Sequence, residues 1–242
     1  MNKLKLKNVT LFAIYHPFND DVNLNLLDST IDALLKSMNL VEFAEAKLIS
    51  SKEIVDFELE KLLNYGIKCE VAKWKIKDIK DYSKYMIYDL YQHIDTDFVL
   101  IIQSDGYVIN PTAWSDDFLN YDYIGAAWPI KEDAYISPFN EHIRVGNGGF
   151  SLRSKKLLRT PLDIDIPFDC TQGDFYKHFN QNNFNEDGCI SVHNRHLYEA
   201  NHCIFAPVDV AVRFSQELPV PESFGVTPFG FHKNLPIGFN YV

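Results

Sequence analysis

The chain has 242 residues, of which 46% are hydrophobic, with a mean hydropathy of −0.17 and a formal net charge of −10. This composition excludes wholesale disorder and leaves room for one large α/β domain or two small ones. The acidic balance argues against a nucleic-acid partner, because duplex binding depends on basic side chains that neutralise phosphates.

The cysteines and the amino terminus predict a cytoplasmic protein. The four cysteines form no Cys-x-x-Cys pair, which argues against a zinc ribbon and for reduced thiols. The amino terminus lacks the apolar stretch of a signal peptide, and no window reaches the length of a transmembrane segment. The alternating Lys3, Lys5 and Lys7 allow peripheral contact with anionic lipid at the inner face of the membrane, although a solvated strand edge is the simpler interpretation.

Alternating apolar runs and helical periodicities predict repeated strand–helix units in the amino-terminal half, an order that favours parallel strand pairing. The absence of a GxGxxG sequence after the first strand argues against a dinucleotide site. The expected strands are residues 9–15, 43–49, 67–71 and 98–102, and the expected helices are residues 24–38, 52–64 and 82–93, the last capped by Ser83.

The pattern is less regular after Asp105, but no repeat or low-complexity linker divides the chain, so a single domain over residues 1–242 is expected. Surface loops are expected at residues 131–142 and 161–185, and a wrapped, non-helical tail from Pro219. The remaining expected elements are strands at 121–128, 150–152, 204–206 and 208–214 and helices at 114–119, 154–159 and 189–198.

The strand at residues 98–102 is an unbroken apolar run, typical of a strand buried on both faces of a mostly parallel sheet. It ends in Gln103-Ser104-Asp105-Gly106, and ligands of open α/β sheets bind beyond the carboxyl ends of the strands. A carboxylate there can hold a divalent cation, which in turn can hold a diphosphate. A simple Asp-Gly turn accounts for the same residues.

Three more polar groups could carry chemistry, and each has a plainer explanation. Gly146-Asn147-Gly148-Gly149 allows close backbone approach to a ligand, or is a glycine-rich bulge between strands. Glu186-Asp187 could supply a general base, or could lie at the start of a helix, where acidic residues are stabilising. His232 could ligate a metal, or could be a surface histidine in a proline-rich tail.

The blocks FVLIIQSDGYVINPTAW, YDYIGAAWP, VGNGGFSLRS, NEDGCIS, APVDVAVRFSQE and FGFH occur between residues 98 and 232. Together they resemble the glycosyltransferase-A (GT-A) superfamily, and within it an uncharacterised bacterial family found in surface-polysaccharide gene clusters. The resemblance implies an α/β fold: one Rossmann-like GT-A domain with a mixed, mostly parallel central sheet flanked by helices. Residues 1–105 would bind the nucleotide and residues 106–242 the sugar and acceptor.

The resemblance also implies an activity: transfer of a sugar, with inversion, from a nucleotide-sugar donor to a glycan or lipid-linked acceptor. The implied donor is a UDP-sugar, and the implied cofactor is Mn²⁺ or Mg²⁺, bound by Asp105 and His232. Gln103 replaces the first carboxylate of the usual Asp-x-Asp motif and would bond the ribose or a water on the metal. Asp187 is the implied general base, with Glu186 as the alternate.

Further donor and acceptor contacts follow from the same resemblance. Trp128 would stack on an acceptor sugar, and Tyr15 and His16 lie where the nucleobase docks in the superfamily. The donor-binding set is Tyr15, His16, Lys84, Gln103, Ser104, Asp105, Gly106, Asn147, Gly148 and Gly149.

Two alternatives stay open. A metal-dependent hydrolase could use Asp105 with the His193/His196 region, although the latter lacks the HExxH pattern and favours solvent-exposed histidines. A non-catalytic nucleotide- or glycan-binding module would account for the missing first carboxylate at Gln103.

Overall fold

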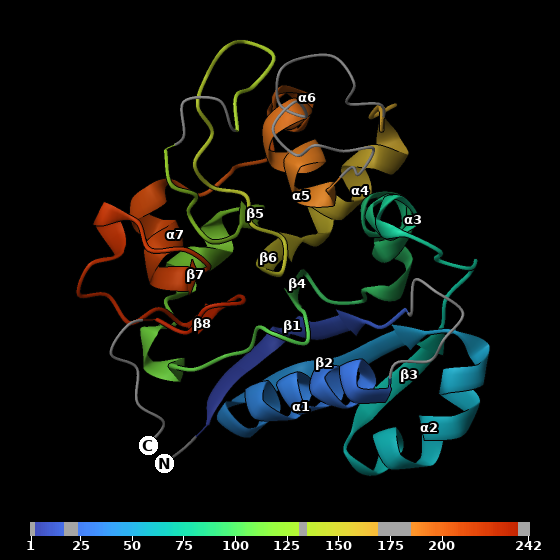
Figure 1. The fold of residues 1–242 in the computed structure, drawn as a ribbon. Helices are drawn as coiled ribbons and strands as arrows, with labels where there is room; N and C mark the ends of the chain where they lie inside the picture. Colours follow the sequence, from blue (N-terminus) through green and yellow to red (C-terminus); the bar gives the residue numbers. More distant parts are fainter. Residues whose placement is uncertain (1–2, 17–23, 131–134, 169–184, 237–242) are drawn as a thin grey trace.

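The computed structural model describes residues 3–16, 24–130, 135–168 and 185–236 and is organised around a six-stranded sheet (Figure 1). Its order is β3-β2-β1-β4-β6-β5, with parallel pairing from β3 to β4 and β6 antiparallel to both neighbours. The predicted mixed, mostly parallel sheet is confirmed. The strands are β1 (Leu4–Ile14), β2 (Val41–Ser50), β3 (Ile67–Val71), β4 (Phe98–Ile102), β5 (Tyr123–Ile124) and β6 (Phe150–Ser154).

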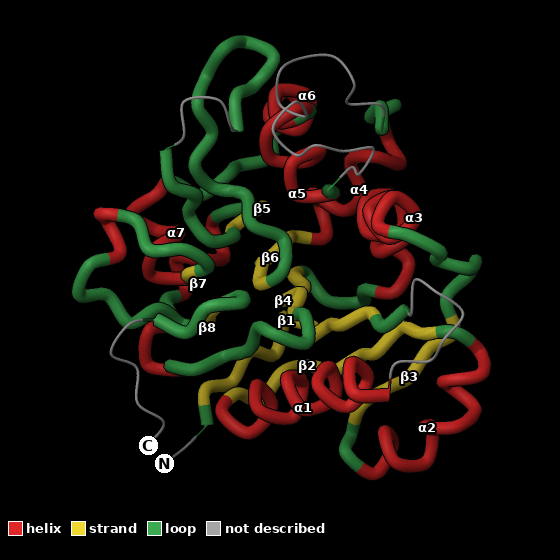
Figure 2. Tube along the Cα trace, viewed as in Figure 1, coloured by secondary structure: helices red, strands yellow, loops and turns green. Residues whose placement is uncertain are grey.

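Helices cover both faces of this sheet. The first are α1 (Leu24–Leu40), α2 (Lys52–Asn64) and α3 (Ile79–Lys84), the last continuing as a π turn (Tyr85–Asp89) and a 3-10 turn (Leu90–His93). The later ones are α4 (Lys155–Asp163), α5 (Glu186–Gly188) with a π turn (Cys189–His193), α6 (Arg195–Ala200) and α7 (Val208–Phe214). Short 3-10 turns occupy Pro111–Ala113, Asp116–Asn120 and Pro221–Ser223, and β7 (Ser215–Gln216) pairs in parallel with β8 (Gly230–Phe231). Figure 2 shows the longer loops around β5 to β8.

The central strand β4 is buried from both sides, as predicted. Leu100 and Ile102 belong to the core that β4 shares with α1 and α2, whereas Val99 and Ile101 pack with α3 and α4 on the opposite face. All four side chains are at most 1% exposed. Because β4 is packed on both faces, the position of its carboxyl end is fixed, and so is the start of the turn at residues 103–106.

Several predicted elements were wrong in type or extent. Residues 208–214 form a helix rather than a strand, because Pro207 precedes it at the N-cap and burial of Val210 and Phe214 outweighs the strand preference of the valines. The helix predicted from residue 82 begins at Ile79. Its cap is Asp78, which accepts a hydrogen bond from the Asp81 N–H, and not Ser83.

Other predicted elements shrink to short segments. The strand expected at 121–128 reduces to β5, and that at 204–206 reduces to a single bridge between Tyr123 and Phe205. The helix expected at 114–119 is the 3-10 turn Asp116–Asn120, which Ser115 caps. Residues 131–134 and 169–184 of the two predicted loops lie outside the described residues.

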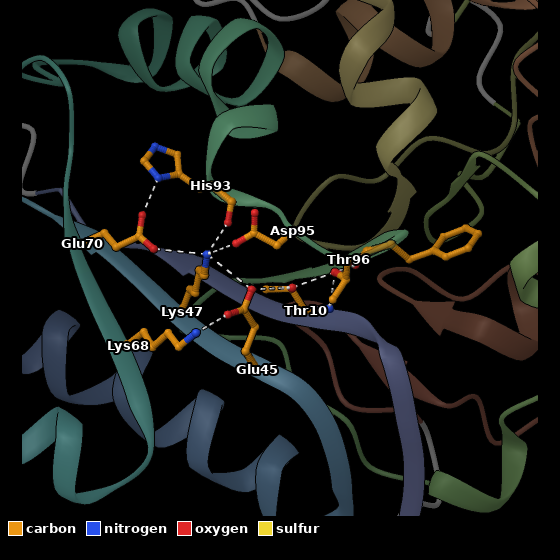
Figure 3. A network of polar contacts seen from close by, with 9 residues as sticks. Thr10, Glu45, Lys47, Lys68, Glu70, His93, Asp95 and Thr96 are labelled. Carbon is orange, nitrogen blue, oxygen red and sulfur yellow. Dashed lines mark hydrogen bonds and ion pairs between the residues drawn. The ribbon is translucent and has the colours of Figure 1, made fainter.

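A buried lysine on β2 pairs with several carboxylates beside the sheet (Figure 3). Lys47 on β2 is 5% exposed, and its Nζ donates to the His93 carbonyl at 2.6 Å. The same Nζ lies 3.3 Å from Glu45, 3.2 Å from Glu70 and 3.5 Å from Asp95. Three carboxylates therefore gather around one desolvated ammonium group.

Replacing Lys47 with alanine is expected to destabilise the protein by about 2–4 kcal/mol, because partly buried carboxylates lose their cation. The matched control is Lys68→Ala, since Lys68 also pairs with Glu45, at 2.7 Å, but is 63% exposed. The control should cost less than about 1 kcal/mol. Urea denaturation measures both, and equal losses would contradict the role given to Lys47.

Candidate functional site

The turn after β4 places the first set of polar groups at the carboxyl edge of the sheet. The Gly106 N–H donates to the Gln103 carbonyl at 3.1 Å, which closes the turn. The Gln103 side chain donates from Nε2 to the Tyr82 hydroxyl at 3.2 Å, and its Oε1 lies 3.1 Å from His232 Nε2. Asp105 is half-exposed and faces the same histidine, so an Asp-Gly turn and a polar site coexist here.

Backbone pairing brings His232 to this turn from the far end of the chain. The His232 N–H donates to the Gln216 carbonyl and the Lys233 N–H donates to the Asp105 carbonyl, both at 2.9 Å. Phe231 packs edge-on against Tyr107, with ring centroids 4.8 Å apart. The tail is thus held on both sides, which fixes the histidine beside Asp105.

The His232 ring lies between two carboxylates. Its Nε2 is 3.4 Å from Asp105 Oδ1, and its Nδ1 is 3.3 Å from Glu217 Oε1 and 3.1 Å from Asn147 Nδ2. Burial alone would lower the pKa of His232, but the hydrogen bonds to Asp105 and Glu217 outweigh it and raise the pKa to about 8. The same histidine lowers the pKa of Asp105. Without a metal ion the two carboxylates therefore favour the protonated ring, to which Asn147 would present its amide oxygen, because Nδ2 and a protonated Nδ1 are both donors.

This pairing predicts a pH-dependent stability for the protein in EDTA. Because the folded pKa of His232 lies above its ordinary 6.5, the stabilisation is complete below about pH 6.5 and is lost as the pH rises through 8. The loss should reach about 2 kcal/mol. Denaturant titrations of the wild type and His232→Gln from pH 6 to 9 test this, and superimposable pH profiles would contradict it.

Two glycines of the Gly146–Gly149 segment let its backbone pack directly against side chains of the site. A Cβ on Gly149 would lie 2.3 Å from His232 Nε2, and one on Gly148 would lie 2.3 Å from Glu186 Oε1. Any side chain there would displace the histidine or the acidic pair. The backbone of this segment therefore packs directly against His232 of the tail on one side and against Glu186 of α5 on the other.

The two adjacent acids have different surroundings. Glu186 forms a buried ion pair with Arg153 at 2.9 Å, and both side chains are at most 6% exposed. Asp187 accepts backbone hydrogen bonds from Gly148 at 3.0 Å and Gly188 at 2.7 Å. Burial and then the neighbouring Glu186 charge raise the pKa of Asp187 to about 7. A carboxyl group with such a pKa can exchange protons near neutral pH.

These groups surround a cleft of about 250 Å³, to which both Asp187 and His232 contribute. A second hollow of about 200 Å³ adjoins it, because Tyr82 and Gln103 line both. Its wall includes Tyr15, His16 and Ser104. His16 is 8% exposed, its Nε2 has no hydrogen-bond partner among the described residues, and burial lowers its pKa to about 4, so the ring is neutral.

Other sequence-predicted residues lie apart from the polar centre. Lys84 does not line either hollow, and its ammonium lies 5.3 Å from the centre of the Phe168 ring. Gly106 is buried beneath the tail, where a Cβ would approach the Phe231 carbonyl at 2.7 Å. Trp128 lines the cleft, but Tyr135 stacks on it with centroids 4.0 Å apart.

Sequence reasoning missed several members of the site. Arg153 lies just beyond the strand expected at 150–152, whereas in the structure it belongs to β6, and a basic residue at a buried strand position signals an ion pair. Tyr82 was assigned to an apolar helix face. Glu217 ends the block APVDVAVRFSQE, but its proximity to His232 depends on the pairing of β7 with β8.

The donor atoms around Asp105 suit a hard cation. Asp105 Oδ1, His232 Nε2 and Gln103 Oε1 converge, and Glu217 on the other ring nitrogen is the outer partner that metal-bound histidines commonly have. Within the described ranges no group of three or more His, Cys, Asp or Glu side chains could by itself hold a metal ion. Gln103 would therefore have to complete the set. None of the described helices is long and apolar enough to cross a membrane.

The family model described as "Protein of unknown function (DUF5672)" matches residues 66–232. No curated protein sequence matches the chain. Among solved structures, the apo form of mouse xyloside xylosyltransferase 1 has a TM-score of 0.50 and 12% identity, covering 97% of this chain and all (100%) of that one.

Two further solved structures show weaker similarity. That of S. aureus TarS 1–349 has a TM-score of 0.39 and 14% identity over 66% of this chain, which spans half (50%) of that fragment. A structure of GalNAc-T7 with UDP, GalNAc and Mn²⁺ has a TM-score of 0.28 and 18% identity, covering 43% of this chain and 19% of that one. The similarity to the xylosyltransferase extends over 97% of this chain and shows that the fold is GT-A-like, as predicted from the sequence.

Proposed function

The chain belongs to the DUF5672 family, and from its GT-A-like fold and the geometry of its cleft we propose that it is a glycosyltransferase with a nucleotide-sugar donor. The observation that carries this proposal is the cleft that His232 and Asp187 both line, with Asp105 3.4 Å from the histidine ring. His232 and Asp105 are suited to bind the cation of a diphosphate, and Asp187 is suited to accept a proton.

The donor would extend across both hollows. The nucleobase, uracil in our proposal, would occupy the hollow of Tyr15 and His16, where the neutral His16 ring offers a hydrogen-bonding nitrogen. The diphosphate would lie near Asp105, and the sugar would lie against Asn147 and the Gly148–Gly149 backbone. In this proposal residues 1–105 bind the nucleotide and residues 106–242 bind the sugar and acceptor.

Asp105 and His232 would hold Mn²⁺ or Mg²⁺, and Gln103 would be a third ligand through its side-chain oxygen or would hydrogen-bond the ribose. The cation would neutralise the negative charge that develops on the departing nucleoside diphosphate. A chain of net charge −10 needs such local compensation to bind an anionic donor.

Asp187 is the proposed general base. Its carboxylate would take the proton of the acceptor hydroxyl while that oxygen bonds to the anomeric carbon and the bond to the diphosphate breaks, with inversion. Glu186 is the less suitable alternate, because the Arg153 ion pair occupies it. The Gly148 and Gly188 N–H groups orient the Asp187 carboxylate toward the cleft that it lines.

The acceptor in this proposal is a glycan or lipid-linked saccharide of surface-polysaccharide synthesis, beside the aromatic wall of Trp128 and Tyr135. Lipid-linked acceptors would place the enzyme in the cytoplasm at the inner membrane face. The amino-terminal lysines contribute little to such binding, since Lys5 and Lys7 both pair with Glu42.

The test is hydrolysis of a panel of nucleotide sugars with Mn²⁺, Mg²⁺ or EDTA. We expect slow, cation-dependent hydrolysis of one donor, about 10²–10⁴-fold slower in Asp187→Asn. Wild-type activity should rise as the pH increases through about 7, because Asp187 must lose its proton to act as a base. Asp187→Asn should still bind UDP in a thermal-shift measurement.

Other outcomes would favour other functions. A UDP-dependent rise in melting temperature without release of sugar would indicate a non-catalytic binding module, which Gln103 in place of a carboxylate would permit. Cleavage of substrates that lack a nucleotide would indicate a hydrolase. Against the latter, His196 lines a different cavity from the one that His232 and Asp187 share.

A further inference from the structure

A larger cavity of about 530 Å³ lies behind the aromatic wall of the cleft. Trp128 and Tyr135, which line the cleft, pack in one apolar cluster with Val192 and Ile143, which line the larger cavity. Its volume falls within the range of about 300–1,000 Å³ that is typical of small-molecule sites. The proposed transfer reaction leaves this cavity without a role.

An exposed aromatic ring stands at the rim of the cavity. Phe139 is 62% exposed at the tip of a hairpin that is closed by hydrogen bonds from Ser137 N–H to the Glu141 carbonyl and from Ile143 N–H to the Tyr135 carbonyl. The Phe139 ring meets His196 edge-on, with centroids 4.9 Å apart. A flat apolar face next to polar groups suits the mixed surface of a sugar ring, which has apolar C–H faces and hydroxyl edges.

Both arginines of the wall are paired with carboxylates, and the wall also carries the carboxylate of Glu141. Arg195 pairs with Glu199 at 2.7 Å, and Arg144 makes two hydrogen bonds to Glu222, at 2.6 and 3.1 Å. Both guanidinium groups already have a carboxylate partner, so neither is poised to bind a phosphate. Electrostatic complementarity therefore favours a neutral ligand over an anionic one.

One buried nitrogen in the wall lacks a partner. Nδ1 of His196 is inaccessible to solvent and makes no hydrogen bond with any described residue, although buried polar atoms are almost always paired. Because Nδ1 has no open space beside it, a ligand hydroxyl would bond it only after the His196 ring turned toward the cavity.

We propose that this cavity binds a neutral saccharide, namely the part of the acceptor glycan beyond the sugar that reacts. The assignment to the acceptor depends on the proposed transferase function, whereas saccharide binding as such does not. One hairpin carries Tyr135 to the cleft and Phe139 to the cavity, so a glycan that contacts both would be held by a single element.

The test is saturation-transfer NMR and calorimetric titration of the full chain. The probes are neutral oligomers of glucose, galactose and N-acetylglucosamine, from disaccharides upward. We expect at least one oligomer to bind, and Phe139→Ala and His196→Ala each to weaken binding by about tenfold. Circular dichroism and melting temperature check the fold of each variant.

Phe224→Ala is the matched control, because Phe224 is 94% exposed and is not among the residues that line the cavity. This variant should bind the oligomer as tightly as the wild type. The proposal is overturned if no oligomer binds, or if Phe139→Ala and Phe224→Ala bind equally. Oligomer binding without any nucleotide-sugar hydrolysis would instead overturn the transferase function and support the cavity as a saccharide site.

Discussion

The site depends on one imidazole ring held between two carboxylates. His232 comes from the tail, Asp105 from the turn after β4 and Glu217 from the end of β7, so the ring joins three segments that are distant in sequence. Glu217 is nearly buried and would be costly to enclose without a cation, whereas Asp105 is half-exposed; the histidine lies within 3.4 Å of both carboxylates. The same ring nitrogen that faces Asp105 as an imidazolium can face a cation once its proton leaves, so metal binding and proton release would be coupled.

The adjacent acids Glu186 and Asp187 also depend on one basic side chain, Arg153. Arg153 is fully buried and holds Glu186, and that fixed negative charge helps to keep the pKa of the neighbouring Asp187 high. The two adjacent carboxyl groups thus differ in their surroundings: Glu186 is held by Arg153, whereas Asp187 accepts only backbone hydrogen bonds and has a raised pKa. Gly148 and Gly149 make this compact arrangement possible, since their missing side chains leave space for Glu186 and His232.

The regular elements of the fold could be predicted from the sequence, and the irregular ones could not. α2 and β4 have the predicted bounds because each buries an apolar face or run, and β3 has the predicted bounds although only Ile67 in it is buried. The strand predicted at 208–214 was wrong, because this valine-rich segment forms a helix that buries Val210 and Phe214. The motifs predicted Asp105, Asp187 and His232 as site residues, and a basic residue in a buried strand could have pointed to Arg153. Glu217 and Tyr82 could not be found, because long-range pairing rather than local pattern brings them to His232 and Gln103.

The most direct test of the central claim is the position of a cation in crystals of the protein soaked with MnCl₂ and UDP. Anomalous diffraction at the manganese edge locates the ion independently of any assumption about the site. Our account predicts one strong peak bonded to Asp105 Oδ1 and His232 Nε2, with the UDP diphosphate against it, and no peak there in Asp105→Ala. UDP bound without such a peak, or a peak that excludes Asp105 and His232, would contradict it.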